Sequence, residues 1–237
     1  MLPSTLALHP ELQRYRVSPW LMGLIYPLGA RILIPFYFGK IIIHGQEHIP
    51  RSGPVIVAPT HRSRWDALLI SLAVGRRASG RDLRFMVTAT EVQGLQGWFI
   101  RRLGGFPIDL KRLESSSLRY SVALLKAGEM LVIFPEGGIF HDDHIHPLKR
   151  GVGRIALEVE HQLPGSQVSI LPVSLRYSRP YPTWGTKVEI HIGEPLRVDT
   201  YDLKTMKASS EKLTQDLQAR LQALQPVPVT EMVQIGQ

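Results

Sequence analysis

Short apolar runs alternate along this chain with longer stretches in which apolar residues recur at helical spacing. Runs rich in Val, Ile and Leu are typical of buried strands, whereas recurrence every third or fourth position predicts amphipathic helices. The predicted strands lie at residues 40–44, 54–59, 85–87, 104–109, 130–134, 169–175 and 187–192. The predicted helices lie at residues 67–75, 91–102, 113–127, 151–161 and 206–224.

The order of these elements predicts the fold class. Strands that alternate with helices at this spacing indicate βαβ units around a parallel sheet. The short strand at residues 104–109 contains Pro107, which favours an edge or irregular strand. Alternation of apolar and polar residues at 187–192 predicts an antiparallel strand, also at an edge. We therefore expect an α/β fold in a single domain, with a mixed, largely parallel sheet flanked by helices.

Residues 17–39 form a long apolar run that three prolines and Arg31 interrupt. Because a membrane-spanning helix needs about 20 apolar residues without a central charge, the run predicts broken helices that lie in the membrane interface. Its aromatic residues would act as anchors at the level of the headgroups: Trp20, Tyr26, Phe36, Tyr37 and Phe38. The alternative is an N-terminal helical hairpin packed on the protein's own core. The chain thus divides into an N-terminal interfacial helical segment (1–39), a folded domain (40–225) and a mobile tail (226–237).

Composition narrows the possible partners. The 237 residues, 44% of them hydrophobic, suffice for one large α/β domain with a buried core. The absence of cysteine excludes disulfides, thiolate zinc sites and a cysteine nucleophile. A formal net charge of +8 suggests an anionic partner, and no nucleic-acid-binding motif is present. We therefore expect lipid headgroups or an acidic carrier protein, and no nucleic acid.

His61 and Asp66 lie together between a predicted strand and a predicted helix. They can meet if His61 is in the loop and Asp66 is in the first helical turn. A neutral imidazole can then accept a proton from a hydroxyl, while the carboxylate fixes its tautomer and stabilises the imidazolium. No protein nucleophile stands beside them, so the nucleophile would be a substrate hydroxyl. The alternative is structural, because Ser63 and Asp66 also fit a helix capping box.

A second motif, residues 134–138, also follows a strand. Gly137 and Gly138 would let the backbone approach a ligand closely. Glu136 would project into the same cleft as His61 and hydrogen-bond substrate hydroxyls if the two strands are neighbours. The alternative is a sharp turn with a solvated glutamate.

Two other patterns are weaker evidence for a function. Residues 151–156 match the dinucleotide fingerprint, but no strand precedes them; they still form a helix N-terminus at which Lys149 and Arg150 would attract anions. Residues 141–146 contain three histidines and two aspartates, which resemble metal ligands, although a polar surface loop is the simpler interpretation and we expect no metal. The sequence contains no G-x-S-x-G elbow, which argues against a serine hydrolase, and no Walker A sequence, which argues against an NTPase.

Four short motifs occur in one order along the chain. They are His61-x4-Asp66, residues 105–109, residues 134–137 and residues 171–173. Together they resemble the glycerolipid acyltransferase family, whose best-known members are the 1-acyl-sn-glycerol-3-phosphate acyltransferases. The resemblance covers residues 40–195 and would make residues 40–225 the acyltransferase domain.

The resemblance implies acyl transfer from a thioester, acyl-CoA or acyl carrier protein, to a lysophospholipid hydroxyl, with 1-acyl-glycerol-3-phosphate giving phosphatidate. It implies His61 as general base and Asp66 as the residue that orients it, with direct attack and no cofactor. It places the enzyme at the cytoplasmic face of a membrane, as a peripheral or monotopic protein. The substrate-binding residues would be Glu136, Gly137, Gly138, Asp109, Lys111, Arg112, Lys149 and Arg150.

Two departures from the family pattern concern the acceptor. Leu110 and Ile139 stand where the family has arginines that bind the acceptor's phosphate. An arginine fork fits phosphate bidentately, which lysine does less well. Either nearby cations substitute, namely Lys111, Arg112, Lys149 or Arg150, or the acceptor carries no phosphomonoester.

Two other functions remain open. With water as the acceptor, His61 would drive thioester hydrolysis, so the protein would be a hydrolase. A non-catalytic membrane-binding protein would keep its function after His61→Ala.

Overall fold

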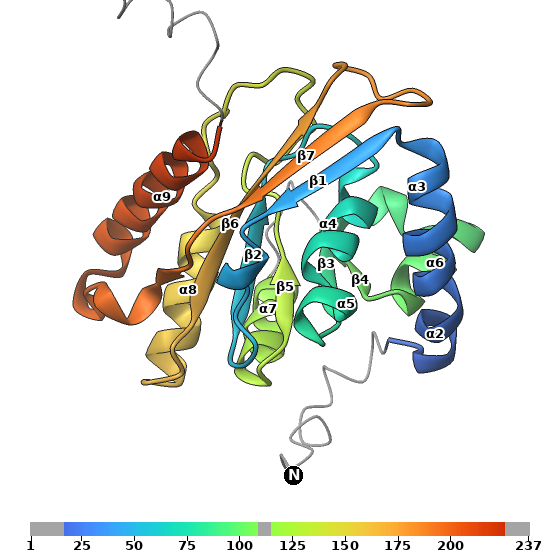
Figure 1. Ribbon diagram of the computed structural model, residues 1–237. Helices are drawn as coiled ribbons and strands as arrows, with labels where there is room; N and C mark the ends of the chain where they lie inside the picture. The colour runs from blue at the N-terminus through green and yellow to red at the C-terminus, as the bar shows by residue number, and fades with distance from the viewer. Residues whose placement is uncertain (1–16, 109–114, 226–237) are drawn as a thin grey trace, which may run out of the picture.

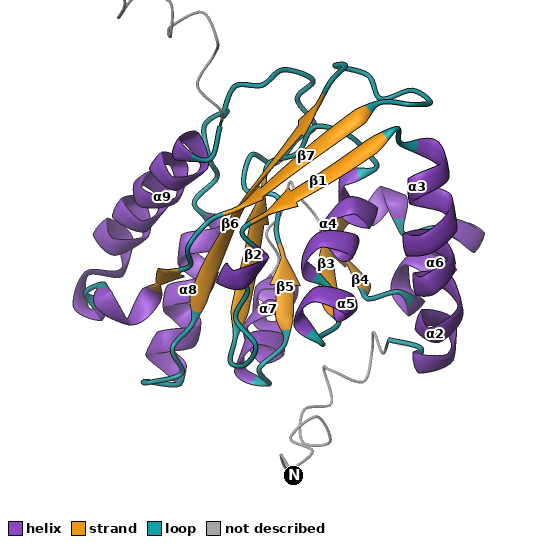
Figure 2. Cartoon of the chain, viewed as in Figure 1, coloured by secondary structure: helices purple, strands orange, loops and turns teal. Residues whose placement is uncertain are grey.

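The computed structural model describes residues 17–108 and 115–225, and an eight-stranded sheet runs through this part of the chain with helices on both faces (Figure 1, Figure 2). The strands are β1 (Lys40–His44), β2 (Val55–Pro59), β3 (Leu83–Thr88), β4 (Gly105–Ile108), β5 (Met130–Val132), β6 (Ser169–Tyr177), β7 (Lys187–Ile192) and β8 (Leu196–Arg197). Their order is β1-β7-β6-β2-β5-β3-β4, with β8 paired to β6. The predicted α/β fold with a mixed, largely parallel sheet is confirmed.

β2 is an interior strand of the parallel part of the sheet. Both of its neighbours, β5 and β6, run parallel to it, so that Val57 lies beside Val132 on one side and Leu171 on the other. β3 and β4 continue in the same direction. Because parallel strands end at the same edge of a sheet, the turns that follow β2 and β5 come side by side.

The two edge predictions have different outcomes. β4, which contains Pro107, ends the sheet as predicted. β7 pairs antiparallel with β6 as predicted, but it is not an edge strand, because β1 lies on its other side and runs parallel to it. The alternation in β7 instead reflects one apolar face, with Val188 and Ile190 fully buried, and one half-exposed polar face.

The helices form two groups on opposite faces of the sheet (Figure 1). They are α2 (Pro19–Leu28), α3 (Ile34–Tyr37), α4 (Asp66–Val74), α5 (Arg76–Ser79), α6 (Gly94–Arg102), α7 (Ser115–Lys126), α8 (Gly151–Gln162) and α9 (Met206–Ala223). Short 3₁₀ turns lie at Gln46–His48, Ala89–Glu91, Val198–Thr200 and Leu203–Thr205. α7, α8 and α9 pack around Ile56 and Leu131, whereas α3 and α4 pack around Val57 and Val132. Since successive strand residues point to opposite faces, β2 contributes to both cores and is buried throughout.

The apolar N-terminal segment forms one continuous helical run and not the predicted broken helices. A π-helical turn, Gly29–Leu33, joins α2 to α3 without interrupting the helix. Pro27 and Pro35 each remove a helical N–H donor, and the widened turn accommodates the lost hydrogen bonds. The 19-residue run, with a mean hydropathy of 1.3, is long and apolar enough to cross a membrane by length and composition.

One face of this run packs on the protein, as the alternative interpretation expected, although the run is one continuous helix and not a hairpin, and the other face is exposed. The buried face includes Leu21, Met22, Ala30 and Ile34. The exposed face carries a stripe of large apolar side chains at every fourth position, which we call the apolar stripe: Trp20, Leu24, Leu28, Ile32 and Phe36.

Only two of the five predicted aromatic anchors are exposed: Trp20, at 72%, and Phe36, at 68%. The other three face the protein, because Tyr26 donates a hydrogen bond to the carbonyl of Ser71, Tyr37 stacks on Trp65, and Phe38 lies in the core. The prediction that these three anchor at headgroup level is therefore wrong. The predicted mobile tail, residues 226–237, lies outside the described residues.

Candidate active site

His61 and Asp66 meet at the carboxyl end of β2, in the arrangement that their spacing permits. His61 lies in the loop that follows the strand, and Asp66 is the first residue of α4. The Nδ1 atom of His61 lies 2.8 Å from Oδ2 of Asp66. With Nδ1 bonded to the carboxylate, the other ring nitrogen, Nε2, is the atom that can accept a proton from a substrate. The His61 ring also stacks on Phe134, with ring centroids 3.9 Å apart.

The carboxylate of Asp66 is fully buried and hydrogen-bonded on both oxygens. Oδ2 accepts from the backbone N–H groups of Arg62 (2.6 Å) and Ser63 (2.9 Å) in addition to His61. Oδ1 accepts from the phenol of Tyr177 at 2.5 Å. Burial, followed by the charge of Asp66, raises the pKa of Tyr177 well above its usual value, so the phenol stays protonated and donates. These donors stabilise a charged Asp66 in one fixed orientation.

The capping-box alternative is present in part: the Asp66 side chain reaches back to Ser63, but Trp65 at the N-cap of α4 makes no side-chain cap. The Ser63 N–H bonds to the Asp66 side chain, and the Ser63 hydroxyl accepts from the N–H of Trp65 at 3.3 Å. One carboxylate therefore both closes the start of α4 and holds the imidazole, so the structural and the chemical interpretations of this motif coexist.

Glu136 lies beside the same turn but does not project into an open cleft as predicted. Its side chain is buried, and Oε2 accepts from the His61 N–H at 2.9 Å. The Nη1 atom of Arg62 lies 2.8 Å and 3.1 Å from the two carboxylate oxygens, and the His146 N–H donates to Oε1 at 3.0 Å. Because protein donors occupy both oxygens, the carboxylate has no free lone pair directed at substrate hydroxyls.

The two glycines of this motif differ in their surroundings. Gly137 has a φ of +74°, which L side chains rarely adopt. A Cβ at this position would lie 3.2 Å from the side chain of Lys149, so the methylenes of Lys149 run over Gly137. Gly138 lies against the ring of Phe140.

The predicted cations divide into three groups. Lys149 is exposed next to the second motif, and its N–H donates to the carbonyl of Pro135 at 2.7 Å. Arg150 forms an ion pair with Glu211 of α9 at 2.8 Å, so its charge already has a partner. Lys111 and Arg112 lie outside the described residues, and so does Asp109, the predicted substrate-binding carboxylate beside them.

The histidine-containing loop folds back onto the site. The N–H of Phe140 donates to the His61 carbonyl at 2.9 Å, and Nη2 of Arg62 donates to the His144 carbonyl at 2.7 Å. Within the loop, Asp142 pairs with His146 at 3.0 Å, which lowers the pKa of the Asp142 carboxyl. In residues 17–108 and 115–225, no group of three or more His, Asp or Glu side chains is placed to hold a metal ion.

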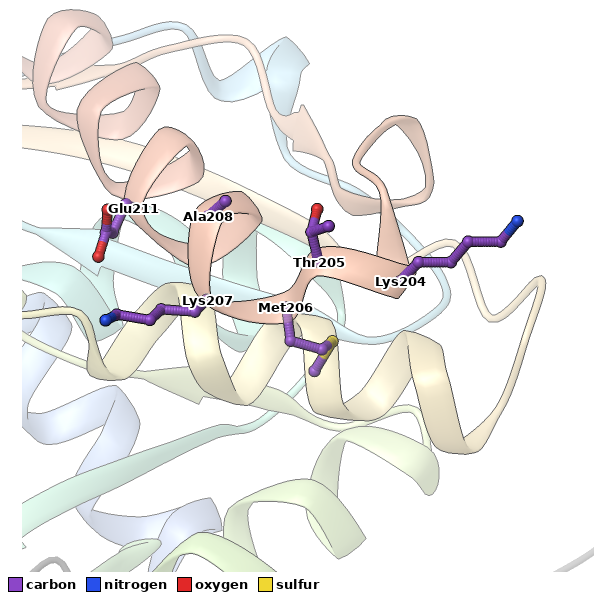
Figure 3. A pocket seen from close by; sticks show the side chains of 6 residues that line it. All are labelled: Lys204, Thr205, Met206, Lys207, Ala208 and Glu211. Carbon is purple, nitrogen blue, oxygen red and sulfur yellow. The ribbon is translucent and has the colours of Figure 1, made fainter.

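Two depressions lie on the surface of the described residues, and one of them adjoins this site. One of about 540 Å³ borders Arg62 and Tyr177 and extends along the start of β7. The other, of about 580 Å³, lies at the start of α9 (Figure 3). Lys204, Thr205, Met206, Lys207, Ala208 and Glu211 line it. The lining of this depression includes neither His61 nor any residue that contacts His61. The depression beside Arg62 and Tyr177 is therefore the one that adjoins the candidate site.

Sequence reasoning missed Arg62 and Tyr177. Arg62 is only 3% exposed and sits directly after His61, but a buried arginine has no periodic signal. Tyr177 is the last residue of β6, on a face that the strand's pairing with β2 and β7 determines.

The sequence profile of the family described as Acyltransferase matches residues 40–176, more than half of the chain. The chain belongs to the acyltransferase family.

Two relatives indicate which group of acyltransferases the chain resembles. A 1-acyl-sn-glycerol-3-phosphate acyltransferase from Streptococcus pneumoniae is 27% identical over 197 residues, which cover 78% of this chain but 66% of that protein. The protein of the same name from Bacillus subtilis is 26% identical over 195 residues, covering 79% of this chain and 89% of the relative. The predicted membership of the glycerolipid acyltransferases is thereby confirmed.

The fold of this acyltransferase also has a solved counterpart. The crystal structure of the 1-acyl-sn-glycerophosphate acyltransferase PlsC from Thermotoga maritima superposes with a TM-score of 0.59 over 89% of this chain and 88% of that one. At 23% identity the likeness supports the shared fold.

Proposed function

We propose that this acyltransferase moves a fatty acyl group from an acyl thioester to the free hydroxyl of 1-acyl-glycerol-3-phosphate, giving phosphatidate. The relatives named for this reaction support the choice of acceptor. The observation that carries the chemistry is the 2.8 Å contact between His61 and a fully buried Asp66. Within the described residues, no Ser or Thr hydroxyl bonds to the His61 ring, which favours a substrate hydroxyl as nucleophile.

The proposed mechanism has two steps. Nε2 of His61 takes the proton of the acceptor hydroxyl while its oxygen attacks the thioester carbonyl carbon, which forms a C–O bond and a tetrahedral intermediate. The intermediate then collapses, the C–S bond breaks, and the leaving thiolate takes the proton from the imidazolium. Asp66 stabilises the imidazolium between the two steps. The thiol is that of coenzyme A or of an acyl carrier protein, and no cofactor takes part.

We assign the acceptor's phosphate to Lys149. Its aliphatic stem lies on Gly137, within the motif that the family associates with acceptor binding, and its side chain is exposed. Arg150 suits this role less well because Glu211 already pairs with it. An ammonium group binds phosphate as a point charge, in place of the bidentate arginine fork.

We place the protein on the cytoplasmic face of a membrane as a peripheral or monotopic protein. The apolar stripe supports immersion of α2 and α3 in the interface. The net charge of +8 suits a leaflet that carries anionic lipids.

The test is an assay with purified protein, a radiolabelled acyl donor supplied as acyl-CoA or as acyl carrier protein, and a panel of lysolipids. Labelled phosphatidate from lysophosphatidate is the expected product, and His61→Ala should abolish it without unfolding the protein. Free labelled fatty acid as the main product would establish a hydrolase instead. Transfer only to acceptors without a phosphate would reject lysophosphatidate as the substrate.

A further inference from the structure

We propose that Arg62 and Glu136 form a buried ion pair that positions His61 for proton transfer, so that Glu136 is a positioning residue and not a contact of the acceptor. The inference rests on the proposed function for the reaction in which its effect is measured. Its structural part, the clamping of three loops, stands on contacts that do not depend on the substrate.

The pair is enclosed and nearly complete in its hydrogen bonds. The side chains of Arg62 and Glu136 are 4% and 0% exposed. A buried ion pair is unfavourable unless further hydrogen bonds satisfy both partners. Glu136 also accepts from the N–H groups of His61 and His146, and Arg62 also donates to the carbonyls of His144 (2.7 Å) and His61 (3.3 Å).

These bonds join three segments that are distant in sequence. Arg62 and His61 lie after β2, Glu136 lies after β5, and His144 and His146 belong to the histidine-containing loop. Without the pair, the backbone bond from Phe140 to His61 would still join two of these segments, but the bonds that join all three would be lost. The pair therefore holds the three segments together at the carboxyl ends of β2 and β5. We call the Arg62–Glu136 pair with these hydrogen bonds the clasp.

The clasp fixes His61 through its backbone. The N–H of His61 bonds to Glu136, and its carbonyl accepts from the Phe140 N–H at 2.9 Å. Asp66 holds the ring at Nδ1, and Phe134 covers one ring face. With backbone and ring both held, Nε2 has one position relative to an incoming hydroxyl, which is the condition for efficient general base catalysis.

A positioning role for Glu136 predicts a different kinetic effect from a role in binding the acceptor. A group that binds the acceptor changes KM when it is altered, whereas a group that aligns the base changes kcat. In Glu136→Gln the side chain keeps its size but loses its charge, and its new NH₂ group faces donors. We expect kcat to fall ~100-fold, because a misplacement of about 1 Å can have that effect, with the KM for lysophosphatidate changed less than about twofold.

Three variants complete the experiment. Arg62→Lys keeps the charge but loses the fork and the bond to His144, so kcat should fall while the protein stays folded. The double variant Arg62→Gln/Glu136→Gln removes both charges and should recover part of the thermal stability lost in Glu136→Gln. The matched control is Glu91→Gln. It removes the carboxylate of an exposed ion pair with Arg64, a residue of the turn between His61 and Asp66, and should change neither kcat nor KM.

Amide hydrogen exchange supplies a readout that is independent of activity. Glu136→Gln or Arg62→Lys should speed exchange in peptides that cover residues 60–66 and 141–147, whether or not the enzyme transfers acyl groups. Faster exchange there together with an inactive wild type would support the clasp and reject the proposed function. Unchanged exchange in both segments, or a KM raised about tenfold or more with kcat retained, would overturn the clasp.

Discussion

Tyr37, the last residue of α3, stacks on Trp65, the residue directly before Asp66, with ring centroids 4.5 Å apart. The Tyr37 hydroxyl also donates to the Pro182 carbonyl at 3.2 Å, and its own carbonyl accepts from the Gly185 N–H at 2.9 Å. The apolar N-terminal helix is thus joined both to the turn that carries the His61–Asp66 pair and to the loop between β6 and β7.

This relationship predicts that Tyr37→Ala lowers activity without loosening membrane attachment. Removal of the ring frees Trp65 and the start of α4, so kcat should fall about tenfold, while vesicle binding stays within about twofold. Tyr37→Phe is the matched control, since it keeps the ring and removes only the hydroxyl. Equal kcat values in wild type and Tyr37→Ala would show that the stack does not support the site.

Substitutions of the central pair test the base directly. His61→Ala should reduce kcat by ~10²–10⁴-fold, the usual contribution of a general base. Asp66→Asn should have a comparable effect, because an amide NH₂ facing Nδ1 stabilises the wrong tautomer. Steady-state kinetics measure both, with circular dichroism to show that the fold is kept. An active His61→Ala enzyme would reject the mechanism.

Tyr177→Phe removes the phenol that donates to Asp66 and leaves one oxygen of a buried carboxylate without its donor. We expect a loss of about 1–3 kcal/mol in the free energy of unfolding, together with a lower kcat. Denaturant titrations at neutral pH measure the stability change, and an unchanged midpoint would contradict it.

The same tyrosine predicts that the stability of the fold depends on pH from about pH 10 upward. Because burial raises the pKa of Tyr177 in the folded state, the unfolded chain releases this proton first, at about pH 10. The stabilisation is therefore complete below about pH 10 and is lost as the pH rises further. Between pH 9 and pH 11, wild-type Tm should fall more steeply than Tm of Tyr177→Phe; parallel curves would exclude this assignment.

Lys149→Ala tests the acceptor site. Loss of a charge-assisted hydrogen bond worth about 1.5–3 kcal/mol should raise the KM for lysophosphatidate ~10-fold or more. An acceptor without a phosphate should be affected little. Arg150→Ala is the control, because its exposed pair with Glu211 contributes little. Equal effects of the two variants on KM would reject Lys149 as the phosphate ligand.

The apolar stripe predicts membrane binding. Leu24→Ser/Ile32→Ser should weaken binding to vesicles that contain anionic lipid by about 10²-fold or more, since each buried side chain contributes about 1.5–3 kcal/mol. Leu163→Ser is the control: this residue is also exposed, at 42%, but it lies beyond the end of α8. Co-sedimentation with vesicles measures the difference, and equal binding of the two variants would contradict it.

Local patterns account for most of the secondary structure. Long periodic stretches such as α8 and α9 were predictable because their apolar positions all face one core. Two errors came from context: β7 alternates like an edge strand but has β1 as a neighbour, and the prolines of the N-terminal run are absorbed by a π-helical turn. Neither the identity of a strand's neighbour nor the width of a helical turn is encoded within the segment itself.

The sequence alone indicated the His61–Asp66 pair, because the two residues share one strand-to-helix turn and their spacing permits contact there. It also determined the family, through four motifs in order. Only the tertiary structure showed that Glu136 is enclosed by Arg62, 74 positions away, and that Tyr177, 111 positions from Asp66, supports the pair. Such contacts depend on strand order and register, which arise from packing over the whole domain and not from any single stretch of residues.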